Sequence, residues 1–244
     1  MTEAAVSLRN LTKQYGKSRG IKDISFEVHR GEVFGFLGPN GSGKTTALRT
    51  LVGLIHATSG SAHILGVDAL QPNPSLRENV GYLPGSLGLY SSMTGRAFLH
   101  FLANVRRKDC AKSIDELARR LKVDLDRRIQ DLSKGNRQKI GVIQAFMHRP
   151  QVLLLDEPTS GLDPLVQHEF ESLLDESKAQ GAAIILSSHV LSEVEHLADR
   201  VAIINEGSLL VVASVATLKE RALRSVDLHF DTPPSEKEFM SLSG

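Results

Sequence analysis

Apolar residues gather in four short runs, each flanked by glycine, proline or charged positions. Continuous apolar runs of this length are typical of strands buried on both faces of a sheet. After three of the runs the pattern changes to the spacing of a helix with one polar face. This alternation predicts a parallel α/β core, with strands at 33–37, 152–155, 182–186 and 201–204 and helices at 44–52, 164–179 and 191–198.

Two regions depart from the alternation of strand and helix. Antiparallel strands added to the core are predicted from shorter apolar segments at 6–11, 21–28 and 62–65. Residues from about 94 to 148 show helical periodicity at 94–107 and 114–121 and no convincing strand. We interpret residues 94–148 as an inserted α-helical subdomain.

The composition narrows the classes of protein that remain. With 244 residues, 41% of them hydrophobic, the chain can bury a sizeable core and is not intrinsically disordered. Its 29 basic and 28 acidic residues give a net charge of +1, which provides no overall field for nucleic acid or an anionic membrane. The basic residues between 106 and 131 are interpreted as a solvated helix face rather than a lipid or nucleic-acid patch.

Cys110 is the single cysteine, so an internal disulfide is excluded and a reducing, intracellular compartment is expected. The N-terminal segment does not have the pattern of a signal peptide. The apolar runs are far shorter than the roughly 20 residues that a membrane-spanning helix needs. We expect a chain that starts directly in a folded domain and does not itself cross a membrane.

The residues after the predicted strand 33–37 form a glycine-rich motif. They match G-x-x-x-x-G-K-[ST] and open a predicted helix, which is the context the motif requires. Backbone N–H groups of such a loop point at phosphate, and the positive end of the helix adds attraction. The alternative is a glycine-rich turn with a surface lysine. We predict phosphate contacts from Lys44 and Thr46 and a Mg²⁺ ligand in Thr45, within a set formed by Gly38, Pro39, Asn40, Gly41, Ser42, Gly43, Lys44, Thr45 and Thr46.

Two carboxylates follow the predicted strand 152–155. They are delivered to the carboxyl edge of the sheet, where ligands bind in such folds. Asp156 is the candidate metal ligand and Glu157 the candidate to polarise the water that attacks the terminal phosphate. A solvated acidic turn is the alternative. His189 follows the strand 182–186, so we predict that it reaches the same edge and donates a hydrogen bond to that phosphate.

These motifs together resemble the nucleotide-binding subunit of ABC transporters. Leu132-Ser133-Lys134-Gly135-Asn136 is similar to the LSGGQ signature of that family, and Ser160-Gly161-Leu162-Asp163 to its D-loop. The resemblance implies a P-loop NTPase (RecA-like) fold, ATP hydrolysis with Mg²⁺, and a switch role for His189. It also implies that Tyr15 stacks on adenine, although a partly buried core tyrosine is the alternative. The resemblance covers about residues 6–219.

The signature segment implies a partner. Ser133 can cap a helix predicted at 136–148, whose positive N-terminal end would face an anion. In the family two subunits pair about a two-fold axis, so that Ser133 and Gly135 of one copy close on the ATP held by a second copy or a homologous subunit. The resemblance also implies that Asp163 of the D-loop is a nucleotide-binding residue. An ordinary helix cap without ligand contact is the alternative for Ser133.

The chain departs from the family pattern after Tyr82-Leu83-Pro84, where Gly85 stands in place of the usual glutamine. Our hypothesis is that turnover survives and that this loop serves coupling to a membrane partner more than metal binding. Lys134 and Asn136 replace the glycine and the glutamine of the signature. The variant signature resembles that of the exporter branch, which includes antibiotic and drug extrusion ATPases.

We therefore expect an ATPase domain at 1–219 that powers integral membrane permease subunits from the cytoplasmic face of the cell membrane, with no nucleic-acid partner. Residues 220–244, with a predicted strand at 226–230, read as a tail or the start of a truncated accessory region. Two rival functions are a cytosolic ABC ATPase that is not coupled to transport and an ATP-binding regulatory module with weak hydrolysis. A P-loop kinase or GTPase leaves the signature motif unexplained.

Overall fold

The centre of the protein is a six-stranded sheet, seen in a computed structural model that describes residues 4–16 and 18–221. The strand order is β10-β9-β3-β8-β7-β6. All neighbouring pairs are parallel except β9 and β10. The four predicted core strands are confirmed as β3 (Val33–Leu37), β7 (Val152–Asp156), β8 (Ala183–Ser188) and β9 (Arg200–Asn205). The sheet also contains β6 (Val80–Leu83) and the antiparallel β10 (Ser208–Ser214).

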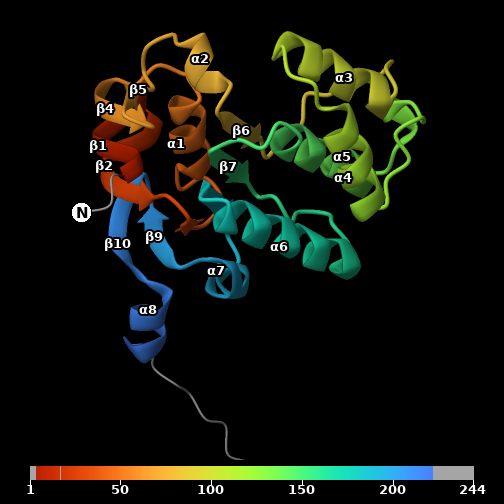
Figure 1. The fold of residues 1–244 in the computed structure, drawn as a ribbon. Coiled ribbons are helices and arrows are strands. Elements are labelled where there is room, and N and C mark those ends of the chain that lie inside the picture. Colours follow the sequence, from red (N-terminus) through yellow and green to blue (C-terminus); the bar gives the residue numbers. More distant parts are fainter. Residues whose placement is uncertain (1–3, 17, 222–244) are drawn as a thin grey trace, which may run out of the picture.

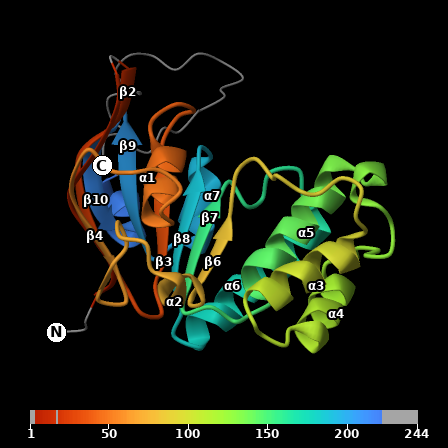
Figure 2. The ribbon, with the colours of Figure 1, turned by 90° about the horizontal axis from the view of Figure 1, so that it is seen from above.

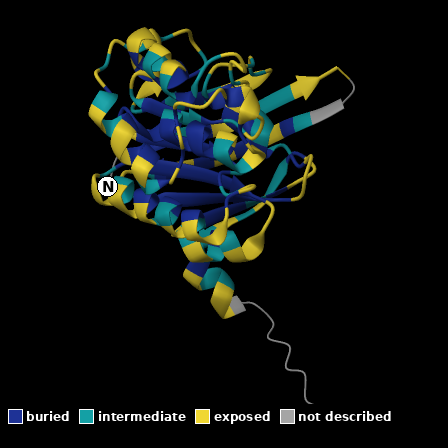
Figure 3. Cartoon of the chain, turned by 90° about the vertical axis from the view of Figure 1, so that its right-hand side faces the viewer, coloured by how far each residue is buried: buried dark blue, intermediate teal, exposed yellow. Residues whose placement is uncertain are grey.

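Both faces of this sheet are buried, as the continuous apolar runs require. In β3, Phe34 and Phe36 belong to one hydrophobic core, and Val33 and Leu37 belong to the other. Figure 3 shows these inner strands as the most buried part of the chain, with exposed residues on the helices and loops outside them. The alternation of side chains along each strand therefore divides the interior into two cores.

Helices cover the two faces of the sheet. Helix α1 (Lys44–Leu51) places Leu48 in the core that holds Phe36, whereas α6 (Pro164–Ala179) and α7 (Leu191–Leu197) face the other core. Each of these helices follows a strand of the sheet, and all three predicted helices are present. The strand ends that precede them consequently lie along one edge of the sheet (Figures 1 and 2).

A second, antiparallel sheet packs against α1 and has the order β2-β1-β4-β5. The strands are longer than their apolar segments predict, because β1 and β2 continue pairing through exposed polar residues and several register shifts. Elements without a sequence prediction are β5, β10, α2 and α8. The bounds are β1 (Ala4–Tyr15), β2 (Ser18–His29), β4 (Ser59–Ile64), β5 (Val67–Asp68), α2 (Pro74–Arg77) and α8 (Val215–Arg221).

The helical segment lies beside the sheet, beyond β6 (Figure 2). It contains α3 (Gly95–Val105), α4 (Ala111–Arg120) and α5 (Lys134–Phe146), with a 3₁₀ turn at Ile129–Asp131. Helix α5 begins two residues before the predicted start, and Ser133 caps it as predicted, by accepting from the Asn136 N–H. The strand predicted at 226–230 lies outside the described residues.

The basic residues of this segment do not form one surface. Arg120 is only partly exposed and contacts Glu169 and Glu176 of α6. Arg119, Lys122 and Arg128 are exposed. The contact of Arg120 ties α4 to a helix of the central sheet, while the exposed residues match the predicted solvated face.

Candidate functional site

A cavity of about 360 Å³ is lined by residues that follow β3, β6 and β7, so it lies at the carboxyl edge of the central sheet. It brings together segments that are more than 100 residues apart in the sequence. The loop before α1 forms one wall, and the end of β7 and the residue after β6 form the other. Its lining consists of Gly20, Asn40, Gly41, Ser42, Gly43, Lys44, Thr45, Thr46, Arg49, Gly85, Ser86, Asp156, Glu157 and Ser160.

The loop between β3 and α1 leaves the helix N-terminus open to a ligand. Gly43 precedes the helix with φ +109°, and a Cβ on it would lie 2.7 Å from the Ile21 side chain, so only glycine fits. Helix α1 has no side-chain cap and no acidic residue in its first turn. Its first N–H groups therefore keep their capacity to bind an anion.

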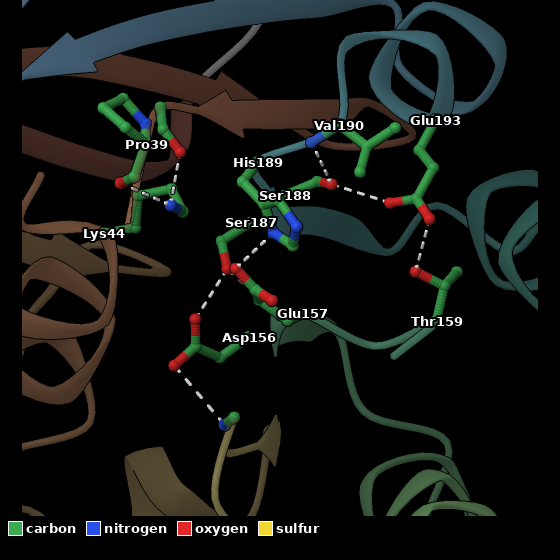
Figure 4. Close-up of polar contacts among 12 residues, drawn as sticks. Pro39, Lys44, Asp156, Glu157, Thr159, Ser187, Ser188, His189, Val190 and Glu193 are labelled. Atoms are coloured by element: carbon green, nitrogen blue, oxygen red, sulfur yellow. Dashed lines mark hydrogen bonds and ion pairs between the residues drawn. The ribbon is translucent and has the colours of Figure 1, made fainter. Parts of the chain in front are cut away.

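Lys44 lies folded into this loop. Its ammonium group donates to the carbonyl oxygens of Gly38 at 2.6 Å and Pro39 at 3.1 Å (Figure 4). Burial lowers the pKa of Lys44 below its ordinary value, and the charges of Glu157 and Asp156 partly oppose that shift. An ammonium group held without a carboxylate bonded to it can exchange its two carbonyl contacts for a stronger anionic partner.

Asp156 is fully buried and is held by donors from three elements. The Ser187 hydroxyl donates to Oδ1 at 2.6 Å, and the Thr45 hydroxyl donates to Oδ2 at 2.7 Å. The backbone N–H of Gly85 also points at Oδ2, at 3.4 Å. The buried carboxylate is therefore fixed in one orientation, with Oδ2 towards the phosphate loop.

Glu157 extends from the end of β7 into a partly exposed position. Its backbone has φ +50°, and its carboxylate oxygen Oε1 lies 3.0 Å from Nδ1 of His189. Figure 4 shows the two side chains facing each other. The Glu157 side chain is 27% exposed, so water reaches it, whereas Asp156 is closed off. The two adjacent carboxylates thus have different environments and are suited to different tasks.

Three further residues bind this centre together, and the sequence analysis did not assign them a role. Ser187 contacts both members of the carboxylate pair. Gln138 of α5 donates to the Pro158 carbonyl at 3.0 Å. Glu193 of α7 accepts from Thr159 at 3.0 Å and from Ser188 at 2.6 Å (Figure 4). The only sequence signal was the pair of serines directly before His189.

The signature residues do not line the cavity of their own chain. The Ser133 hydroxyl caps α5 by accepting from the Asn136 N–H at 3.2 Å. Gly135 lies against the loop after β7, since an added Cβ would be 2.6 Å from the Gly161 carbonyl oxygen. The signature segment therefore lies beside the 160–163 loop. Of these two segments, only Ser160 contributes to the cavity lining.

Asp163 and Tyr15 also lie outside the lining. Asp163 caps α6, and the Val166 N–H, followed by the charge of Lys139, lowers the pKa of its carboxyl below the ordinary value. Tyr15 at the end of β1 is 45% exposed and packs under the Lys13 ammonium. It is not the core tyrosine that was the alternative, and it lies next to Gly20, which does line the cavity.

A parallel sheet that carries a glycine-rich loop before a helix, and an acidic pair at the end of a second strand, defines a P-loop nucleoside triphosphatase. Comparison with known families then specifies the class. The model of the ABC transporter family matches residues 21–160. The chain belongs to this family and is an ATP-binding subunit of the kind whose ATPase activity drives transport.

Individual relatives agree with this assignment. The chain is 35% identical to an uncharacterised ABC transporter ATP-binding protein, YdbJ of Bacillus subtilis, over all of this chain and 79% of that protein. It is also 35% identical to the bacitracin transport ATP-binding protein BcrA of Enterococcus faecalis, over 90% of this chain and 72% of that protein. A solved ATP-binding subunit of an ABC transporter superposes with a TM-score of 0.81 at 27% identity, covering 89% and 92% of the two chains. Within residues 4–16 and 18–221, no helix is both long and apolar enough to span a membrane.

Proposed function

We propose that the chain binds ATP with Mg²⁺ in the 360 Å³ cavity, hydrolyses it within a two-fold dimer, and drives a separate membrane permease. The observation that carries this proposal is the convergence, on one cavity, of an uncapped helix N-terminus, Lys44 and the Asp156–Glu157 pair. The first two bind polyphosphate and the third activates water.

Phosphate binding begins at the loop 38–45. The backbone N–H groups and the positive end of α1 attract the anion, and Lys44 donates to phosphate oxygens in place of the Gly38 and Pro39 carbonyls. Thr46 adds a hydroxyl donor. Tyr15 stacks on adenine, a contact of roughly 1–3 kcal/mol for aromatic side chains and bases.

The donor set of the cavity fits a magnesium ion. The Thr45 hydroxyl oxygen and Asp156 Oδ2 lie 2.7 Å apart, and hard oxygen ligands of this type suit Mg²⁺, which keeps much of its water shell. Bound Mg²⁺ would neutralise the negative charge that develops on the phosphate oxygens. Gly85 offers only its backbone N–H on this side, so no glutamine side chain completes the set.

Hydrolysis requires a base beside the phosphate end of the cavity. Glu157 accepts a proton from the attacking water as the water oxygen bonds to the terminal phosphorus. The bond from that phosphorus to the bridging oxygen breaks, and ADP and phosphate leave. His189 contacts the Glu157 carboxylate through Nδ1 and does not itself line the cavity. In this proposal it reaches the terminal phosphate once ATP is bound and donates a hydrogen bond to it.

The second copy supplies what the cavity of one chain lacks. Ser133 and Gly135 at the N-terminus of α5, together with Asp163, close on the ATP bound by the other subunit. Loss of the terminal phosphate weakens this contact and opens the dimer, which is the motion that a permease can use. Residues 1–219 form the ATPase domain in this proposal, with 94–148 as its inserted helical subdomain and 220–244 as a separate tail.

Export of a drug, lipid or other small molecule is the transport direction we propose. Its support is the similarity to a bacitracin transport ATP-binding protein and the variant signature around Gly135. The chain then lies peripherally on the cytoplasmic face of the membrane. Co-purification with an affinity-tagged subunit tests this: recovery of a membrane permease supports it, and recovery of ribosomes alone would favour an ATPase that is not coupled to transport.

Glu157→Gln tests the catalytic assignment. Because a general base contributes typically 10²–10⁴-fold, phosphate release should fall about 100-fold or more while ATP binding is retained. Glu116→Gln is the matched control, since this glutamate is exposed on α4. Equal, slow phosphate release by the parent chain and Glu157→Gln would instead favour a regulatory module that binds ATP.

A further inference from the structure

Ser187 is a fully buried hydroxyl at the end of β8, between the two carboxylates of the site. The hydroxyl group forms its hydrogen bonds with residues at the end of the neighbouring strand β7 and not with residues of β8. Its hydroxyl donates to Asp156 Oδ1 at 2.6 Å and accepts from the Glu157 backbone N–H at 3.1 Å. One side chain therefore contacts both neighbouring residues, as Figure 4 shows for Asp156.

The bond to Asp156 decides which oxygen of that carboxylate faces the cavity. With Oδ1 taken by Ser187, Oδ2 is the oxygen that meets Thr45 at 2.7 Å and the Gly85 N–H at 3.4 Å. Without the Ser187 hydroxyl, Oδ1 loses its donor and the carboxylate is held through Oδ2 alone, by Thr45 and Gly85. A buried oxygen without a donor is also unfavourable, so the carboxylate would turn to find another partner.

The bond to the Glu157 backbone acts on a strained residue. Glu157 has φ +50°, a left-handed conformation that residues other than glycine adopt at a cost. Its N–H donates to two oxygens of Ser187, the hydroxyl at 3.1 Å and the carbonyl at 3.2 Å. These contacts hold the backbone turn that aims the Glu157 side chain towards His189 and the cavity.

The geometry points to Ser187 as a positioning residue for ATP hydrolysis, whose hydroxyl orients Asp156 and Glu157 together. This inference rests on the roles proposed above for those two carboxylates. Ser187 does not line the cavity, so it acts through them and not on ATP. The adjacent Ser188 differs, because its hydroxyl points the other way, to Glu193 of α7.

The test compares Ser187→Ala with Ser177→Ala. Ser177 also donates its hydroxyl within the fold, to the Leu173 carbonyl at 2.8 Å, but it lies in α6 away from the cavity. For Ser187→Ala we expect kcat to fall about 10- to 100-fold, the range seen when hydrogen bonds that orient functional groups are removed. The KM for ATP and the binding of a fluorescent ATP analogue should change less than about threefold, because the phosphate loop is intact.

Ser187→Cys keeps the shape of the side chain with a somewhat larger sulfur atom and weakens both hydrogen bonds, so it serves if the alanine variant does not fold. A folded Ser187→Ala or Ser187→Cys variant with kcat within about twofold of the parent would overturn the inference. So would an equal loss of kcat and of ATP affinity, or an equal loss in Ser177→Ala. Glu157→Gln measured alongside separates the two proposals, because full activity in that variant contradicts the proposed function itself.

Discussion

Each charged residue of the site is held by contacts that leave its charge, or one of its oxygen atoms, available to a ligand. Lys44 is buried and bonded only to carbonyl oxygens, so its positive charge is not cancelled by a bonded carboxylate. Asp156 uses Oδ1 for Ser187 and presents Oδ2 to the loop that follows β3. Glu157 is the exposed member of its pair. These differences in burial support the binding, metal and proton-transfer roles that we propose for Lys44, Asp156 and Glu157.

Gly85 leads to a prediction at this scale. A Cβ at this position would lie 3.0 Å from Asp156 Oδ2, so Gly85→Gln requires the loop or the carboxylate to move by a few tenths of an ångström. Since a misplacement of about 1 Å can cost 10²-fold, basal ATP hydrolysis should change by less than about tenfold. The measurement is phosphate release without a membrane partner.

Gly88→Ala is the control for that variant, because no described atom lies within 4 Å of the added Cβ. A change of more than about tenfold in Gly85→Gln would mean that this position governs the chemistry more directly than coupling requires.

The site residues that could be predicted from the sequence are those that belong to a short, continuous motif. The spacing around Lys44 and the two acids after an apolar strand identify their segments without a structure. Ser187 and Glu193 were missed because their roles arise from contacts between strands and loops about 30 residues apart, at Asp156 and Thr159. A lone serine or glutamate gives no pattern that distinguishes such a contact from an exposed side chain.

How well each strand could be predicted from the sequence depends on how far its side chains are buried. The parallel strands were predictable because both faces are covered, which makes each strand an unbroken apolar run. Strand β10 was not predicted, since its side chains are mostly partly or fully exposed and its pairing is antiparallel. The end of β1 was missed for a related reason, because exposed polar residues there extend the pairing with β2.

The junction of α3, α5 and β6 gives a prediction at the scale of elements. His148, just after α5, is buried and lies 3.2 Å from the Val80 carbonyl through Nε2. Burial, with the charges of Arg106 and Lys108, lowers the pKa of His148 to about 4. In the unfolded chain His148 takes up a proton near pH 6.5, whereas in the folded chain it stays neutral down to about pH 4. The free energy of unfolding should therefore fall as the pH drops from 6.5 towards 4.

The size of this effect is about 2 kcal/mol in the free energy of unfolding between pH 7 and pH 5. Urea unfolding of the parent chain and of His148→Gln at both pH values measures it, since glutamine can still donate to Val80. The parent should lose about 2 kcal/mol more than the variant on acidification. Identical losses would show that His148 is not the group that titrates.

At the scale of the whole molecule, the proposed dimer requires each chain to carry two halves of different reaction centres. The phosphate loop, Asp156 and Glu157 meet in one cavity, whereas Ser133 and Gly135 lie outside its lining. Helix α5 nevertheless presents its N-terminal end, capped by Ser133, as an anion-binding end without an acidic residue in the first turn. The sequence alone indicated both sets of residues, and the structure adds that Ser133 and Gly135 do not line the cavity of their own chain.

Mixing two inactive variants tests this central claim most directly. Lys44→Ala removes the phosphate contact, and Ser133→Asp keeps a good helix cap while setting a negative charge against phosphate. In a mixed dimer, one centre combines the two substituted residues. The other centre combines the native Lys44 of the Ser133→Asp copy with the native Ser133 of the Lys44→Ala copy. We predict that an equal mixture hydrolyses ATP at about a quarter of the parent rate, although each variant alone is nearly inactive. A mixture no faster than the mean of the two separate variants would contradict a reaction centre shared between copies.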